Sequence, residues 1–255
     1  MTCYIHSSKV LLAMTFISIC LPVFVQAQSG PTAQELLDAL DKNMVAENRI
    51  TVSTMVIHGR RGTRSIQSKS WTQGNRKSYT EYLAPAREKG TKMLKVDDQL
   101  WTYSPGTDRT IQIAGHMLRQ SVMGSDLSYE DMMEDQLLSD IYTPEISGSD
   151  TVNGRDCWVL ELTAKTPDVT YHSRKVWVDK ERDIALKESR YASSGKLLKE
   201  TRIDSVFRVE GRWYPKRMVF KDMLTSGDGT VFILESVDFN AEIPDYIFTK
   251  AVLRR

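Results

Sequence analysis

Apolar and polar residues alternate with a period of two over most of this chain. Such alternation is typical of half-buried β-strands, whose successive side chains point to opposite faces of a sheet. The pattern runs from Ile50 to Ala114 and again from Tyr142 to Asn240, and we count about ten or eleven strands in these regions. Turn sequences such as Asn153-Gly154 separate the strands and predict antiparallel hairpins. The chain is therefore expected to be mostly β, of the α+β class.

Two segments instead show the three- and four-residue spacing of an amphipathic helix. The first is 31–48, for which Ser29 or Thr32 is a suitable N-cap. The second begins after Ser125, which we expect to cap it, and acidic residues interrupt its apolar face. The apolar stripe of the first segment consists of Ala33, Leu36, Leu37, Leu40, Met44 and Val45.

The first 27 residues have the features of a secretory signal peptide. Lys9 provides a positive start, Val10–Val25 is an apolar run interrupted by Pro22, and Ala27 is a small residue suited to cleavage. The run is too short and too broken for a membrane span of about 20 residues. We therefore expect cleavage after Ala27 and a single domain over residues 28–255, stabilised by packing alone because Cys157 would be its only cysteine.

Charge argues against a nucleic-acid partner. The chain has 34 basic and 33 acidic residues, and removal of the signal peptide with Lys9 would make these numbers equal. The charges are nevertheless segregated: residues 60–92 hold nine Lys or Arg, whereas residues 120–150 hold eight Asp or Glu and no base. Solvated faces of strands and helices explain this pattern, and two docking faces of opposite sign are the functional alternative.

The sequence shows no arrangement typical of an active site. The histidines of the expected domain, His58, His116 and His172, have neither zinc-ligand spacing nor a neighbouring cysteine. Cys157 lies in an apolar strand and is expected to be a buried core residue. Ser125 lacks the surrounding glycine pattern of a nucleophile elbow. We accordingly expect no enzyme activity, no metal and no cofactor.

The stretch from Tyr82 to Asp131 is rich in large, adaptable apolar side chains. Methionine and aromatic residues of this kind fill cores and also line apolar ligand pockets. The stretch therefore suggests that the chain encloses an apolar ligand. These side chains, together with the two methionines that directly follow the stretch, are Met93, Leu94, Trp101, Tyr103, Ile111, Ile113, Met117, Leu118, Met123, Met132 and Met133.

An ordered series of short motifs resembles the LolA-like family of periplasmic outer-membrane lipoprotein-sorting proteins. The series extends over nearly the whole of residues 28–255. Each motif is short, and the likeness comes from their order. The motifs are Lys89-Gly90-Thr91, Leu100-Trp101-Thr102-Tyr103-Ser104-Pro105, Ser121-Val122-Met123-Gly124-Ser125-Asp126, Tyr129-Glu130-Asp131, Trp177-Val178-Asp179, Gly211-Arg212-Trp213-Tyr214-Pro215, Ile243-Pro244 and Phe248-Thr249.

The resemblance implies an incomplete antiparallel β-barrel whose open side is covered by helices and whose interior holds acyl chains. It implies a periplasmic carrier or chaperone that moves lipid or lipoprotein toward the outer membrane. The implied partners are the acyl chains, an inner-membrane transporter and an outer-membrane acceptor, and we expect a monomer. The expected cavity residues are Leu36, Leu40, Met44, Trp71, Tyr82, Leu94, Trp101, Tyr103, Ile113, Met117, Met132, Met133, Trp158, Trp177 and Phe220.

Two alternatives remain open at the level of sequence. The same fold could serve a non-catalytic periplasmic sensor or scaffold that binds a protein partner instead of a lipid. The helix at 31–48 could be a lid that acyl chains displace or a brace docked permanently on the barrel, since any amphipathic helix must bury its apolar face somewhere. A co-purifying lipid would favour the carrier over the scaffold.

Overall fold

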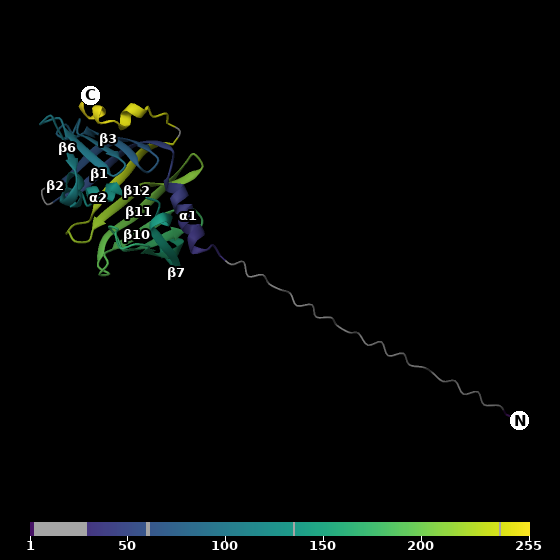
Figure 1. The fold of residues 1–255 in the computed structure, drawn as a ribbon. Coiled ribbons are helices and arrows are strands. Elements are labelled where there is room, and N and C mark those ends of the chain that lie inside the picture. The colour runs from purple at the N-terminus through teal and green to yellow at the C-terminus, as the bar shows by residue number, and fades with distance from the viewer. Residues whose placement is uncertain (3–29, 60–61, 135, 240) are drawn as a thin grey trace. The chain divides into compact units, whose positions relative to one another are not determined.

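The computed structural model describes residues 1–2, 30–59, 62–134, 136–239 and 241–255. The expected signal peptide and Ser29 lie largely outside these residues, and Pro31–Arg255 form one unit (Figure 1). The described residues of this unit form thirteen strands. They are β1 Asn48–Gly59, β2 Gly62–Gln73, β3 Lys77–Ala84, β4 Lys92–Val96, β5 Gln99–Ser104, β6 Arg109–Ile113, β7 Tyr142–Val152, β8 Arg155–Ala164, β9 Ser173–Asp179, β10 Ala185–Tyr191, β11 Leu197–Val209, β12 Arg212–Asp222 and β13 Thr230–Asp238.

The helices are short apart from the first one. Thr32 caps the first helix through a capping box with Glu35, as one of the two expected caps. The helix ends at Met44, before the predicted end at residue 48, because the chain at Val45 is already extended. The helices are α1 Ala33–Met44, α2 Tyr129–Met133 and α3 Leu138–Ile141, and the 3₁₀ helices are η1 Gly115–Arg119, η2 Val122–Gly124, η3 Asp245–Phe248 and η4 Lys250–Arg254.

All thirteen strands belong to one antiparallel sheet with the order β6-β5-β4-β3-β2-β1-β13-β12-β11-β10-β9-β8-β7. Consecutive strands pair with one another except β6 and β7, and β13 returns to pair with β1. Strands β6 and β7 are the two edges, so the sheet is open. The prediction of a mostly β fold with an open antiparallel sheet is therefore confirmed.

Register shifts interrupt the ladders at several places, including Val52/Ser53 and Ser205/Val206. Such bulges bend a strand and increase its twist, which allows a wide sheet to curl. The second shift lies beside Pro215, a residue that β12 contains. Pro215 pairs with Val206 at the irregularity, where the absence of a backbone N–H donor disturbs the hydrogen bonds between β11 and β12 least. Asn153 and Gly154 form the expected two-residue turn, with both residues at positive φ.

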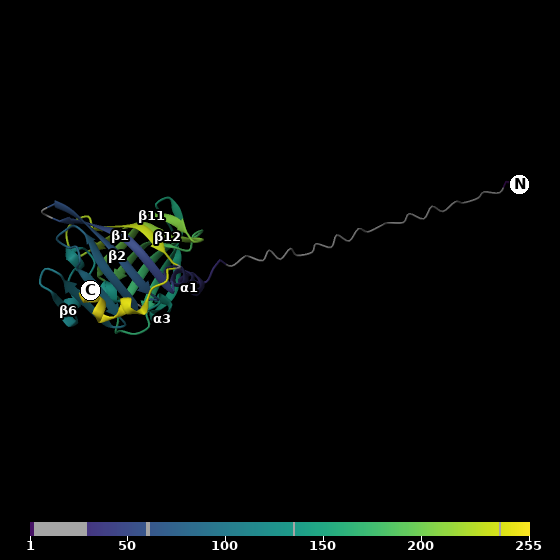
Figure 2. The same cartoon turned by 90° about the horizontal axis from the view of Figure 1, so that it is seen from above.

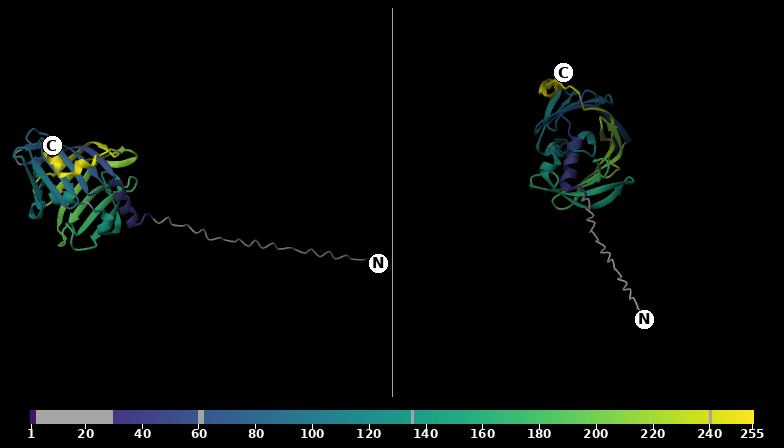
Figure 3. Two further views of the ribbon diagram at one scale, coloured as in Figure 1. Left: turned by 45° about the horizontal axis from the view of Figure 1, so that its top comes forward. Right: turned by 90° about the vertical axis from the view of Figure 1, so that its right-hand side faces the viewer.

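Alternate side chains of the sheet pack into separate clusters on its two faces. Met93 packs with the segment that links β6 to β7, whereas the adjacent Leu94 packs with η3 and η4. Figures 2 and 3 show η3 and η4 in yellow on the outside of the curved sheet, while α1 lies within its curve. The face that surrounds α1 is called the inner face below, and the opposite face is called the outer face.

Candidate functional site: a cavity beneath the first helix

A cavity of about 340 Å³ lies on the inner face, between α1, α3 and strands β9 to β12. This volume is at the lower end of the roughly 300–1,000 Å³ typical of ligand pockets. We call it the inner cavity. Its apolar walls include Leu40, Met44, Leu137, Leu138, Ile141, Val176, Ile184, Ala185, Ile203, Pro215, Met218 and Phe220, and its charged lining includes Glu134, Arg174, Glu188 and Arg190.

Helix α1 forms one wall of the inner cavity because its apolar stripe faces the sheet. Leu36, Leu37 and Leu40 are buried against β7, β8 and β9. Met44, one turn beyond Leu40, also lines the cavity but is 44% exposed. An exposed methionine at the wall indicates that this end of the inner cavity reaches solvent.

The charged lining is centred on two arginines. Arg174 of β9 and Arg190 of β10 are direct cross-strand partners, so their guanidinium groups lie on the same face. Glu188 accepts from Arg174 at 2.8 Å and from Arg190 at 2.9 Å. Glu134 accepts from Arg174 at 2.5 Å and lies 3.9 Å from Arg190. The two carboxylates neutralise the two guanidinium groups.

The two glutamates differ in how firmly they are ionised. Burial opposes ionisation of Glu188, but Arg190 and Arg174 together lower its pKa to about 2. Burial has the larger effect at Glu134 and raises the pKa of that carboxyl, although Arg174 and Arg190 pull it down. The ionised form of Glu134 is therefore less strongly stabilised by the arginines than that of Glu188.

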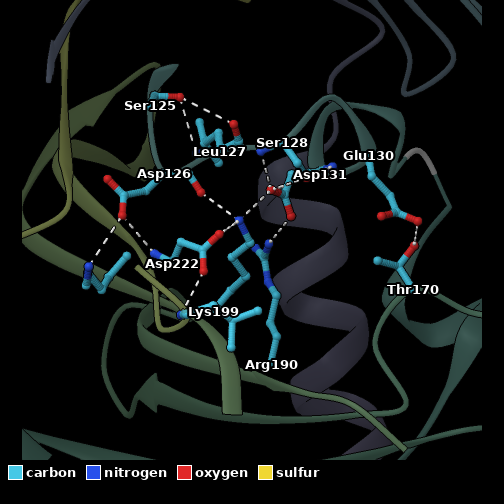
Figure 4. A network of polar contacts seen from close by, with 12 residues as sticks. Ser125, Asp126, Leu127, Ser128, Glu130, Asp131, Thr170, Arg190, Lys199 and Asp222 are labelled. Carbon is cyan, nitrogen blue, oxygen red and sulfur yellow. Dashed lines mark hydrogen bonds and ion pairs between the residues drawn. The ribbon is translucent and has the colours of Figure 1, made fainter. Parts of the chain in front are cut away.

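A second group of buried charges continues from the arginines along the inner face (Figure 4). Asp131 is 3% exposed, accepts from Tyr171 at 2.5 Å and lies 3.6 Å from Lys199. Burial opposes its ionisation, yet the hydrogen bonds from Tyr171 and Ser128 lower its pKa below the usual range. Lys199 also contacts Asp222 at 2.9 Å.

These contacts correct two predictions about residues 120–150. Asp131 does not belong to a solvated or docking face, because its buried carboxylate neutralises internal bases, whereas Glu134 is exposed and pairs with Arg174. Ser125 is not the N-cap of the helix that follows it; its hydroxyl contacts the backbone of Leu127, and Ser128 is the N-cap of α2 instead. Asp135 lies outside the described residues.

The structure distributes the fifteen expected cavity residues over several clusters. Leu40, Met44 and Phe220 line the inner cavity. Leu36 and Trp158 belong to the cluster beneath α1, next to the cavity. A third set packs elsewhere on the inner face, around η1, η2 and α2, and consists of Tyr82, Ile113, Met117, Met132 and Met133.

The remaining five expected residues pack away from the inner cavity, in two other clusters. Four of them, Trp71, Leu94, Trp101 and Tyr103, pack on the outer face beneath η3 and η4. Trp177 belongs to a separate cluster with Cys157 and Val159. Their assignment to the cavity is therefore corrected. Successive residues of a strand point to opposite faces of the sheet, so the large residues of β4 and β5 are divided between the inner face and the outer face.

Sequence reasoning missed the charged end of the inner cavity. This end is formed by three charged strand residues, Arg174, Glu188 and Arg190. Charged residues in a strand normally face solvent, so the residue types alone did not indicate that these side chains line a cavity. A signal was present in the spacing, because Arg174 is two residues from Val176 and must share its face. The partner Glu134, 40 residues earlier in sequence, could be found only from the tertiary structure.

Cys157 is fully buried, as expected, and burial raises the pKa of its thiol. The described residues contain no group of three or more His, Cys, Asp or Glu side chains arranged to hold a metal ion. No helix within the described part of the chain is long and apolar enough to cross a membrane.

The open, curved sheet with α1 on its inner face defines a protein of the LolA-like fold. Three solved structures share it over most of their length. A DUF1329 family protein from Desulfovibrio piger matches with a TM-score of 0.77 and 23% identity, over 87% of this chain and 97% of its own. A putative outer membrane lipoprotein-sorting protein domain from Vibrio parahaemolyticus matches with a TM-score of 0.75 and 22% identity, over 88% and 98%.

The third structure, a LolA superfamily protein from Nitrosomonas europaea, has a TM-score of 0.71 and 24% identity, over 87% of this chain and 99% of its own. The resemblance in fold is thus confirmed. In sequence, residues 74–255 match a family model described as "Uncharacterized protein", and the chain belongs to this family. No curated protein matches the sequence.

Proposed function

We propose that this protein is a periplasmic carrier that holds an acyl chain of a lipid or lipoprotein in the inner cavity and moves it toward the outer membrane. The observation that carries the proposal is the apolar cavity between α1 and the inner face of the sheet. The shared fold supports it, since one similar structure is described as a putative lipoprotein-sorting domain. The protein acts as a monomer that receives its ligand at the inner membrane and delivers it to an acceptor.

Binding follows from burial of the acyl chain. Each buried CH₂ group contributes about 0.8 kcal/mol in principle, so partial burial of one chain gives a useful and reversible affinity. The small volume of the inner cavity favours a single chain over the several chains of a complete lipoprotein anchor. Movement of α1 would enlarge the space, because this helix forms one wall.

Native mass spectrometry of protein purified without detergent tests the proposal directly. We expect a fraction of the protein to carry a lipid adduct, and delipidated protein to bind a dansyl-labelled fatty acid. Protein that is always empty and does not bind the probe would contradict the carrier function and favour the sensor or scaffold.

A blocked cavity provides the matching genetic test. Ile203 of β11 lines the inner cavity and is buried, so Ile203→Trp should fill the space and weaken probe binding about tenfold or more. Ile111→Trp makes the same exchange at an exposed position that does not line the cavity and should leave binding unchanged. Equal binding by both variants would show that the probe binds elsewhere.

A further inference from the structure

We propose that Arg174 and Arg190 form a head-group site for the carboxylate of a single-chain fatty acid, and that the ligand's carboxylate takes the place held by Glu134. This inference rests on the proposed carrier function and names the chemical class of its ligand. It starts from the position of the two arginines. They border an apolar cavity, so a molecule with a hydrocarbon chain and one charged end matches both parts of the lining.

Both arginines have hydrogen-bonding capacity that the described residues do not use. The Nε atoms of Arg174 and Arg190 are buried, and no described group accepts a hydrogen bond from either. The Arg174 side chain is only 4% exposed. A buried donor without an acceptor is costly, and a planar guanidinium group binds carboxylates with matched geometry. The pair is therefore suited to an additional or replacement carboxylate.

Glu134 is the replaceable partner. Glu188 lies on β10 itself, contacts both guanidinium groups and belongs to the framework of the sheet. Glu134 follows the last residue of the five-residue helix α2 and reaches the arginines from outside the sheet. Displacing its side chain requires no break in the strand ladder. The raised pKa of the Glu134 carboxyl agrees with its weaker hold on the site.

Charge balance favours a monoanionic head group. The groups facing Arg174 and Arg190 are Glu134 and Glu188, and Asp131 lies 3.5 Å from Arg190. Exchanging the Glu134 carboxylate for a fatty-acid carboxylate leaves the net charge of the buried site unchanged. An uncharged head group would leave a guanidinium group poorly paired in a buried environment, which is unfavourable.

The exchange also couples ligand entry to the wall of the inner cavity. Gln136, Leu137 and Leu138 follow Glu134 closely in sequence and line the same cavity. Once the ligand carboxylate occupies the arginines, Glu134 is released, and the link between α2 and the sheet through Arg174 is lost. Ligand binding should therefore loosen the segment that leads from α2 into α3.

The test compares dodecanoate with its methyl ester, two molecules of the same chain that differ in charge, as competitors of the dansyl-labelled fatty acid. Wild-type protein should bind dodecanoate about tenfold more tightly than the ester. Arg174→Gln should abolish this preference. Glu134→Gln removes the competing carboxylate and should strengthen dodecanoate binding several-fold without changing affinity for the ester, on the scale of charge-assisted hydrogen bonds.

Glu130→Gln is the matched control, because Glu130 lies in α2, four residues before Glu134, and contacts Thr170 rather than the arginines. It should bind both competitors as the wild type does. Equal affinity of wild-type protein for acid and ester, or an unchanged ratio in Glu134→Gln, would overturn the head-group site while leaving the carrier function intact. Failure of both competitors to displace the probe from wild-type protein, or failure of the probe to bind, would overturn both proposals.

Discussion

Two arginines face one another across neighbouring strands in this protein. Like charges at directly opposite positions normally destabilise a sheet. Here Glu188, two residues before Arg190 on the same strand, bridges Arg174 and Arg190. A buried ion pair is not strongly stabilising in itself, but removal of one member leaves the other charge uncompensated. Glu188 hydrogen-bonds to both guanidinium groups, so its removal is expected to destabilise the fold.

We therefore expect Glu188→Gln to lower the free energy of unfolding by on the order of 3 kcal/mol at pH 7. The folded-state pKa of Glu188 is lowered from 4.5 to about 2, so its stabilising contribution is complete above pH 4.5 and is lost as the pH falls toward 2. Urea denaturation of wild type and variant over this range measures the difference. A gap that stays constant between pH 5 and pH 3 would contradict this assignment.

Helix α1 is held at both of its ends by different means. The capping box of Thr32 and Glu35 satisfies its first turn. Near its other end, the buried carboxylate of Asp41 accepts from the backbone N–H groups of Leu138 at 3.0 Å and Ser139 at 2.9 Å. This contact ties α1 to α3, and both helices line the inner cavity. Asp41 is therefore the residue whose removal can distinguish a lid from a brace.

Asp41→Ala leaves two N–H groups of α3 without their acceptor and should cost about 1–2 kcal/mol of unfolding free energy. If α1 is a lid, the variant should also take up the dansyl-labelled fatty acid faster in stopped-flow mixing, because closure is weakened. Asp38→Ala, at an exposed position of the same helix, should change neither quantity. An unchanged association rate in a destabilised Asp41→Ala protein would identify α1 as a brace.

At the scale of the whole molecule, the sheet separates the inner cavity from a second apolar core. The outer face of β3 to β5 is covered by η3 and η4, where Leu253 is fully buried and Lys250 lies 4.0 Å from the ring centre of Trp101. The inner cavity lies against β9 to β12 on the other face. Substitutions in the outer core should therefore affect stability, whereas substitutions in the inner cavity should affect ligand binding.

Trp101→Ala should lower the free energy of unfolding by about 3–5 kcal/mol and leave the affinity for the dansyl-labelled fatty acid unchanged. Phe220→Ala should weaken binding of the probe, because Phe220 lines the inner cavity, with a smaller loss of stability since its side chain is only partly buried. Thermal denaturation and probe titration of both variants measure this contrast. Weaker binding by a folded Trp101→Ala protein would place the ligand outside the inner cavity.

The sequence by itself determined the elements that depend on local patterns. Period-two alternation identified the strands, helical spacing together with Thr32 identified α1, and Asn153-Gly154 identified a hairpin turn. The apolar surroundings of Cys157 also predicted its burial correctly. These features are local because backbone conformation responds mainly to neighbouring residues, and the ordered motifs then allowed the LolA-like fold to be recognised.

Only the tertiary structure decided which face of each strand lies inside. Alternation divides a strand into two sets of residues but does not say which set meets α1, and each bulge exchanges the sets. For this reason the sequence pattern places Trp101 in the cavity, whereas in the structure it packs against η3 and η4. The same limit concealed Arg174, whose charge predicted solvent exposure, and its contact with Glu134. The burial of Arg174 depends on contacts between segments far apart in the chain, which bring opposite charges together on the inner face.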